Sequence, residues 1–268
     1  MFKHLPKLAI GLSALAVAQI FSLAIAQSAS AFGFNQDWIE VDTGDLNQSF
    51  TVDFNGNSST KDVTGLTSQA TFTFKGFQSN ASNTKALFDI RLTNTSTGIL
   101  SKTSGLGFNV YKDMYQPTLP LASTGNTSTG LFTSAIKGGS LPNGFGNIDI
   151  CFTIGTACQG TTSTSSGGVD NNPQTTLAST GTFSATLNLT GINVQKFALA
   201  HFGVGYQNIT GTVGGVNYSG ASGTGKGKIN YDLSGGPKKI PEPTTTAALG
   251  FFAVSALGTR KRKAVAQA

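Results

Sequence analysis

The chain has 268 residues, among them 34 glycines, and only 11% of its residues are charged, against about 25% in an average globular domain. So few charges exclude the usual surface of a cytosolic domain. The formal net charge is +6, but the excess lies in the two terminal segments, and residues 32–239 hold twelve basic and eleven acidic side chains. Nucleic-acid binding needs basic residues clustered on a folded face, so the charge distribution argues against it.

The N-terminal segment has the three parts of a secretory signal peptide. Lys3 and Lys7 precede an apolar run over residues 8–26, and Ala29 and Ala31 form a small-x-small cleavage site. A retained membrane anchor is the alternative that the length of the run permits. The cleavage site within a few residues favours removal of residues 1–31, so we expect the mature chain to begin at Phe32.

The C-terminal segment combines a proline motif, an apolar stretch and a basic cluster. The motif is Pro241-Glu242-Pro243, the stretch covers residues 244–258, and the cluster is Arg260-Lys261-Arg262-Lys263. Fifteen helical residues extend about 22 Å, short of the roughly 30 Å hydrocarbon core, so this predicted transmembrane helix is marginal. The basic cluster is expected to stay cytoplasmic, which places the proline motif at the outer membrane face.

This tail resembles the sorting signal of the PEP-CTERM family of exported bacterial proteins, which has the same three parts in the same order. The resemblance covers residues 241–268 and departs from the family in the five residues after the basic cluster. It implies processing by an exosortase, a membrane protease-transpeptidase, and association with extracellular polysaccharide. An ordinary tail anchor with coincidental prolines is the alternative.

Residues 32–233 alternate apolar and polar side chains with the period of β-strands. In residues 85–92, Ala86, Phe88, Ile90 and Leu92 share one face. Further strands are expected at residues 50–54, 71–74, 106–111, 148–152, 182–189 and 194–206. No segment has a helical apolar stripe, so the sequence predicts one all-β domain, an antiparallel β-sandwich or jelly roll.

The connections are rich in Gly, Ser, Thr and Asn. Residues 55–59, 160–168 and 214–227 are predicted connections, with mobile loops at 160–173 and 220–227. Residues 234–240 read as a linker that holds the domain off the membrane.

Cys151 and Cys158 are the only cysteines. In an exported chain two nearby cysteines most often form a disulfide, and a metal site would need two further ligands. The pair in its Gly-rich setting is also similar to the cistern group of PEP-CTERM proteins, which implies no activity. We expect a disulfide and no cofactor or metal.

Catalysis finds little support in the sequence. His201 is the only histidine of the expected mature chain, so any Ser-His-Asp or Cys-His mechanism would have to use it. Asp149 and Asp170 could form a glycosidase pair only if the fold brought them together. No catalytic residue is therefore assigned.

Two binding alternatives remain open. Oxygen ligands crowd near the mature N-terminus and could hold Ca²⁺ in a lectin-like module, although their spacing is not that of an EF-hand; they are Asp37, Glu40, Asp42, Asp45 and Asn47. Aromatic side chains could add sugar contacts, namely Trp38, Tyr111, Tyr115, Tyr206 and Tyr218. The favoured expectation is a non-enzymatic exported protein of the cell surface or matrix, with a carbohydrate-active hydrolase and a Ca²⁺-stabilised carbohydrate-binding module as alternatives.

Overall fold

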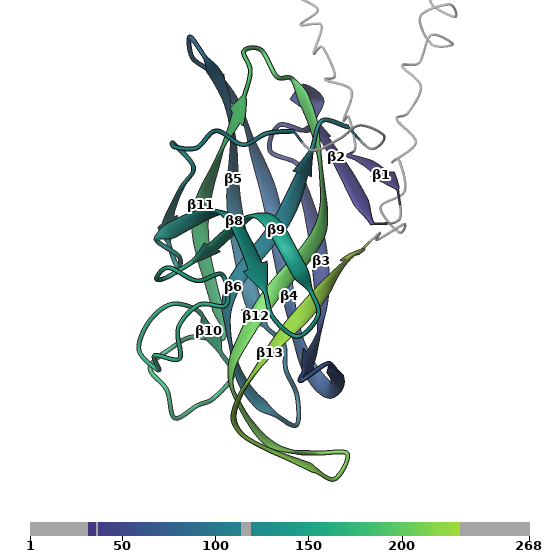
Figure 1. Ribbon diagram of the computed structural model, residues 1–268, viewed down its shortest axis with the longest axis vertical. Helices are drawn as coiled ribbons and strands as arrows, with labels where there is room; N and C mark the ends of the chain where they lie inside the picture. The colour runs from purple at the N-terminus through teal and green to yellow at the C-terminus, as the bar shows by residue number, and fades with distance from the viewer. Residues whose placement is uncertain (1–31, 36, 114–118, 231–268) are drawn as a thin grey trace, which may run out of the picture.

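The structure is a computed structural model that describes residues 32–35, 37–113 and 119–230. These residues form thirteen β-strands and one short 3-10 helix, η1 (Thr43–Asp45), and the long strands run along the long axis of the molecule (Figure 1). The predicted all-β class is confirmed. The strands are β1 (Gly33–Asn35), β2 (Trp38–Asp42), β3 (Ser49–Ser58), β4 (Lys61–Ser79), β5 (Asn83–Asn94), β6 (Leu100–Tyr111), β7 (Thr127–Gly130), β8 (Ser134–Leu141), β9 (Gly146–Thr153), β10 (Val169–Asp170), β11 (Thr180–Thr190), β12 (Lys196–Val213) and β13 (Val216–Asn230).

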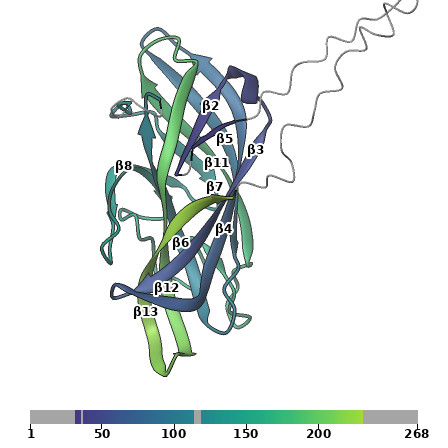
Figure 2. The ribbon, with the colours of Figure 1, turned by 90° about the vertical axis from the view of Figure 1, so that its right-hand side faces the viewer.

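The strands belong to one antiparallel sheet that curls around a single core. Ten of them are hydrogen-bonded in the order β7-β11-β5-β4-β3-β13-β12-β6-β9-β8. The ends of this path, β7 and β8, contact each other, and β10 pairs with β6 while touching β5 and β11. The sheet is therefore nearly closed and barrel-like, and the two layers expected of a sandwich are opposite walls of one sheet (Figure 2).

In β3, β4 and β5 apolar and polar residues alternate, which gives this part of the sheet a buried inner face and a more exposed outer face. Most of β6 and β12 is buried on both faces. Phe50 stacks on Phe72 with ring centroids 4.8 Å apart, and Phe202 lies edge-on to Phe72 at 5.6 Å. Such aromatic pairs add stability beyond the area they bury. Other fully buried large side chains are Phe54, Phe74, Phe88, Phe108, Phe132, Phe152, Phe197 and Tyr206.

Two of the loop predictions are wrong, because the segments belong to strands. Residues 220–227 lie inside β13, and residues 55–58 are the end of β3. Residues 160–168 do connect strands, but they pack on the sheet, because the Lys102 ammonium donates to the carbonyls of Ser163 at 2.7 Å and Ser166 at 3.3 Å. Val169–Asp170 then form β10 instead of continuing the loop.

The predicted disulfide between Cys151 and Cys158 is present, with Cα atoms 5.5 Å apart. Both cysteines are buried, and with Leu141 and Ile148 they form a small apolar cluster beside the main core. The disulfide thus joins β9 to the start of the segment that packs over β6.

Candidate functional site

The outer face of β3, β4, β5, β11 and β7 carries a regular array of hydroxyl, amide and charged side chains. Neighbouring strands lie about 4.8 Å apart, so residues paired across them form straight rows. We call this array the polar face. Its three rows are Ser49-Thr73-Asp89-Ser184-Thr129, Thr51-Thr71-Arg91-Thr182 and Asp53-Gln69-Thr93-Thr180.

Hydrogen bonds between neighbouring strands hold many of these side chains in place. The hydroxyls of Thr51 and Thr71 lie 3.2 Å apart, and those of Thr93 and Thr180 lie 3.1 Å apart. The Ser184 hydroxyl donates to a carboxylate oxygen of Asp89 at 2.7 Å. The face is therefore ordered before any ligand arrives, which lowers the entropy lost on binding.

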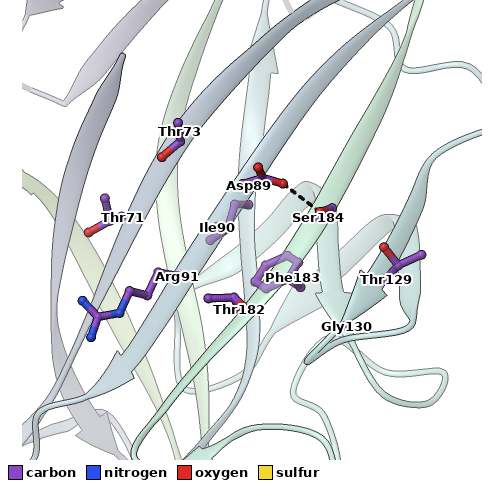
Figure 3. A pocket seen from close by; sticks show the side chains of 10 residues that line it. All are labelled: Thr71, Thr73, Asp89, Ile90, Arg91, Thr129, Gly130, Thr182, Phe183 and Ser184. Carbon is purple, nitrogen blue, oxygen red and sulfur yellow. Dashed lines mark hydrogen bonds between the residues drawn. The ribbon is translucent and has the colours of Figure 1, made fainter. Parts of the chain in front are cut away.

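A hollow of about 520 Å³ lies on the polar face between β4 and β7 (Figure 3). Ile90 and Phe183 belong to its lining together with polar residues from four strands. Arg91 is exposed, and its guanidinium has no hydrogen-bond or ion-pair partner within the described part of the chain. The hollow thus offers free donors from Arg91 beside acceptors from Asp89.

The charges on and beside this face have both signs. Asp53 and Asp89 are negative, while Arg91 and Lys228, which pairs with Asp53 across β13 and β3, are positive. Lys75 and Lys85 follow on the outer side of β4 and β5, beyond the rows. A surface of hydroxyls, amides and charges of both signs binds polar ligands through hydrogen bonds.

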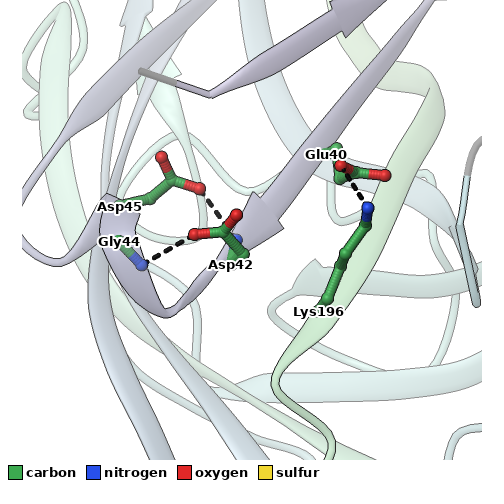
Figure 4. A network of polar contacts seen from close by, with 5 residues as sticks. All are labelled: Glu40, Asp42, Gly44, Asp45 and Lys196. Carbon is green, nitrogen blue, oxygen red and sulfur yellow. Dashed lines mark hydrogen bonds and ion pairs between the residues drawn. The ribbon is translucent and has the colours of Figure 1, made fainter. Parts of the chain in front are cut away.

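Three of the acidic residues near the N-terminus, Glu40, Asp42 and Asp45, are engaged in the protein's own contacts (Figure 4). Asp42 caps η1 by accepting from the Gly44 amide at 2.7 Å, and Asp45 accepts from the Asp42 amide at 2.8 Å. Glu40 forms an ion pair with Lys196 at 2.6 Å. Among the described residues no group of three or more His, Cys, Asp or Glu side chains is placed to hold a metal ion.

Asp45 is nevertheless unusual. Its side chain is almost fully buried, and one of its carboxylate oxygens, Oδ1, has no hydrogen-bond partner. Burial raises the pKa of Asp45 to about 6, the Asp42 amide lowers it in part, and the charges of Asp42 and Glu40 raise it further. The carboxylate costs stability when it is ionised.

The two carboxylates considered as a glycosidase pair are not brought together. Asp149 accepts from the Val110 amide at one end of β6, and Asp170 pairs with Lys102 near the other end. Eight residues of strand separate Lys102 from Val110, or about 26 Å, against the roughly 5 to 9.5 Å that glycosidases require. Asp149 and Asp170 therefore do not form a glycosidase pair.

The aromatic candidates fall into two groups. Trp38 and Tyr111 pack together at the surface with ring centroids 4.1 Å apart, and His201 lies in the same hollow. Tyr206 is fully buried, which raises the pKa of its phenol, and Tyr218 is half-buried against the core. Tyr115 lies outside the described residues.

The predicted terminal motifs also lie outside the described residues. These are the cleavage site Ala29 and Ala31, the linker 234–240, the motif Pro241-Glu242-Pro243 and the cluster Arg260-Lys261-Arg262-Lys263. Within the described ranges, the chain has no helix with the length and apolarity needed to cross a membrane.

The polar face was not predicted from the sequence, because its residues are dispersed over five strands instead of clustering in loops. The signal was present in the strands, where Thr71 and Thr73, Asp89 and Arg91, and Thr182 and Ser184 alternate with buried residues. The pairing of strands distant in the chain then places these residues side by side.

Comparisons with known protein families, with curated proteins and with solved structures find no match.

Proposed function

We propose that this chain is a non-enzymatic exported protein of the cell surface or extracellular matrix that is sorted by a PEP-CTERM tail and binds exopolysaccharide. An exosortase-type protease is its sorting partner, and the membrane holds it only before processing. The polar face, with its ordered hydroxyls and free Arg91 donors, is the observation that carries the binding part of this proposal.

The sorting part rests on the sequence. An exported protein needs a leader, and the N-terminal segment has one that ends in a small-x-small site. A protein processed at its tail needs a segment that is held in the membrane, and the C-terminal segment has the proline motif, the apolar stretch and the basic cluster for this. The disulfide between Cys151 and Cys158 supports export, because disulfides persist in oxidising compartments.

The polar face suits a neutral polysaccharide for two reasons. Its threonine, serine, glutamine and aspartate side chains match hydroxyl groups as both donors and acceptors. Rows that extend across several strands offer repeated contacts, so a polymer gains avidity from contacts that are individually weak.

A calcium-stabilised module is the competing function. The unpartnered oxygen of Asp45 is the one observation in its favour. Because a ligand that binds only the folded state stabilises it, millimolar Ca²⁺ would raise the melting temperature if this function were correct. Our proposal expects no shift.

Affinity electrophoresis tests the binding part of the proposal. The full-length chain, purified in mild detergent, is run through native gels that contain the exopolysaccharide of its own host. We expect retardation of the wild type and about tenfold weaker binding for the double variant Thr71→Val, Thr182→Val, because two hydrogen-bonding hydroxyls are lost while the side-chain shape is kept.

A matched control uses two exposed threonines away from the hollow, Thr190→Val and Thr212→Val. This variant should be retarded like the wild type. Absence of retardation of the wild type would contradict polysaccharide binding, and release of new reducing ends from the polymer would favour the hydrolase alternative.

A further inference from the structure

β12 changes its neighbour along one edge, and the change leaves a notch in the sheet. β2 pairs with β12 from Lys196 to Ala200, and β13 takes over from Gly203. The ladder with β6 on the other edge also skips from Ala200 to Gly203. His201 and Phe202 fall in this gap, where a hollow of about 190 Å³ opens to the surface.

Aromatic rings form one side of the notch. Trp38, at the start of β2, packs on Tyr111 at the end of β6, and both are half-buried. The His201 ring lies 4.4 Å from the ring of Phe145 and is also half-buried. Trp38, Tyr111 and His201 belong to the lining of the hollow, so aromatic residues form part of its wall.

The backbone at His201 is strained. Its φ is 52°, in the left-handed region that non-glycine residues seldom adopt. Strained residues persist where the surrounding structure enforces them, and they concentrate at ligand sites. His201, with this backbone conformation, belongs to the lining of the notch.

Opposite charges lie on the rim. Asp37 and Lys226 are both exposed and line the notch, and both also line an adjoining hollow of about 440 Å³. That second hollow includes Asp53, which belongs to the polar face, and Lys228, which pairs with Asp53 from the neighbouring strand β13. The notch therefore continues onto the polar face.

We propose that the notch binds one neutral pyranose ring of a polysaccharide whose neighbouring units lie on the polar face. The C–H face of the ring packs on Trp38 and Tyr111, and its hydroxyls bond to Asp37 and Lys226. This inference rests on the proposed function, because it names the sugar-recognition subsite of the same polymer-binding surface.

The residues favour a neutral ring over a charged one. One carboxylate and one ammonium give the notch no net charge. For a uronic acid, the attraction of its carboxylate to Lys226 is therefore offset by its repulsion from Asp37. The volume of about 190 Å³ suits a single ring and not an oligosaccharide. The aromatic side then selects rings with an apolar face, which hexoses have.

Trp38 makes the test direct, because it is the only tryptophan in the chain. The full-length chain in mild detergent is titrated with three soluble polysaccharides: a mixed-linkage β-glucan, a galactomannan and the polyuronate alginate. We expect at least one neutral polymer to change the intensity or wavelength of tryptophan emission in a saturable way, and alginate to change neither.

Variants separate recognition in the notch from binding on the polar face. Tyr111→Ala, Asp37→Asn and Lys226→Gln should each weaken the saturable fluorescence response at least threefold. Lys61→Gln, at the exposed start of β4 outside the three rows and both hollows, is the matched control and should respond like the wild type. Thermal melting of each variant shows whether the fold is kept.

Gel retardation reports polymer binding by the whole chain, whereas tryptophan emission reports binding in the notch. If polysaccharide retards the chain in gels while Trp38 emission stays constant and the notch variants bind like the wild type, the notch inference is overturned and polymer binding stands. A stronger response to alginate than to the neutral polymers would overturn the choice of a neutral ring. Loss of both retardation and fluorescence response would contradict the proposed function itself.

Discussion

At the scale of single residues, His201 and Asp45 each have a conformation or environment that costs stability. His201 has a left-handed backbone, and Asp45 places a carboxylate with an unpartnered oxygen below the surface. Both residues lie near places where strands begin or change partners. Each cost can be measured by a conservative substitution.

Replacing His201 by glycine should give a more stable protein than replacing it by alanine. Both changes remove the contact with Phe145, but only glycine relieves the left-handed strain, which is worth about 1 kcal/mol. Urea unfolding of the two variants measures the difference. In ordinary strand positions alanine is the more stable of the two, so equal stability or a more stable alanine variant would refute the strained backbone.

Asp45 should make stability fall as pH rises from about 4 to about 6. Its folded pKa of about 6 is above the ordinary value of 3.8, so the folded state binds more protons in this window, and the stabilising protonated form is lost as pH increases. Asp45→Asn should flatten this dependence and raise stability at pH 7 by about 1 to 2 kcal/mol.

Denaturant unfolding at pH 4 and pH 7 measures this effect. Asp62→Asn, at an exposed position in β4, is the control and should leave the profile unchanged. An Asp45→Asn protein that keeps the pH dependence of the wild type would show that another group is responsible.

At the scale of elements, the segment between β9 and β11 is held on the sheet by side chains. Burial lowers the pKa of Lys102 to about 8, partly offset by the charge of Asp170, and the Lys102 ammonium reaches two carbonyls of the segment. Glycines permit close approach, since a methyl group at Gly105 would overlap the carbonyl of Cys158. The predicted mobile loop is therefore a tethered one.

Replacing Lys102 by methionine should release residues 160–168 from the sheet. Two hydrogen bonds are lost, each worth about 1 kcal/mol, so amide hydrogen exchange in this segment should become about tenfold faster or more. Lys61→Met, at an exposed site, should leave exchange unchanged. Unchanged exchange in the Lys102 variant would mean that the other contacts hold the segment, namely the disulfide, the glycine contacts and hydrogen bonds such as that from the Asn208 amide to the Thr162 carbonyl at 2.9 Å.

Strands with alternating large residues could be predicted from the sequence, and β13 could not. β5 and most of β11 follow the expected alternation. In β6 and β12 runs of consecutive residues are buried, and β12 extends to Val213. In β13 the inward positions are Gly223, Gly225 and Gly227, where an added methyl group would overlap neighbouring backbone or core side chains. The alternation is present in β13 as glycine at every second position. The high glycine content led to the prediction that this segment is a loop.

The candidate site was less predictable than the fold. Its rows depend on strand order, since β5 lies between β4 and β11, which are distant in the chain. The notch depends on the switch of β12 from β2 to β13, which no local pattern encodes. The disulfide was predictable because only two cysteines exist and they lie close in sequence.

At the scale of the whole molecule, the described β-structure is polar and weakly charged, and we propose that the two terminal segments direct its export and sorting. The 11% charged residues leave a surface of hydroxyls and amides that is hydrated without strong attraction to ions. Such a surface suits a protein held within a polysaccharide matrix. We propose that the chain reaches that matrix after losing both ends.

Mass spectrometry of the intact protein from the native host's polysaccharide fraction tests this claim most directly. The account predicts a chain that begins at Phe32, keeps the Cys151–Cys158 disulfide and lacks the basic cluster Arg260-Lys261-Arg262-Lys263. In a Glu242→Ala host strain, a form that retains this cluster should accumulate in the membrane fraction instead. A full-length chain beginning at Met1, found in the cytoplasm and absent from the polysaccharide fraction, would contradict the account.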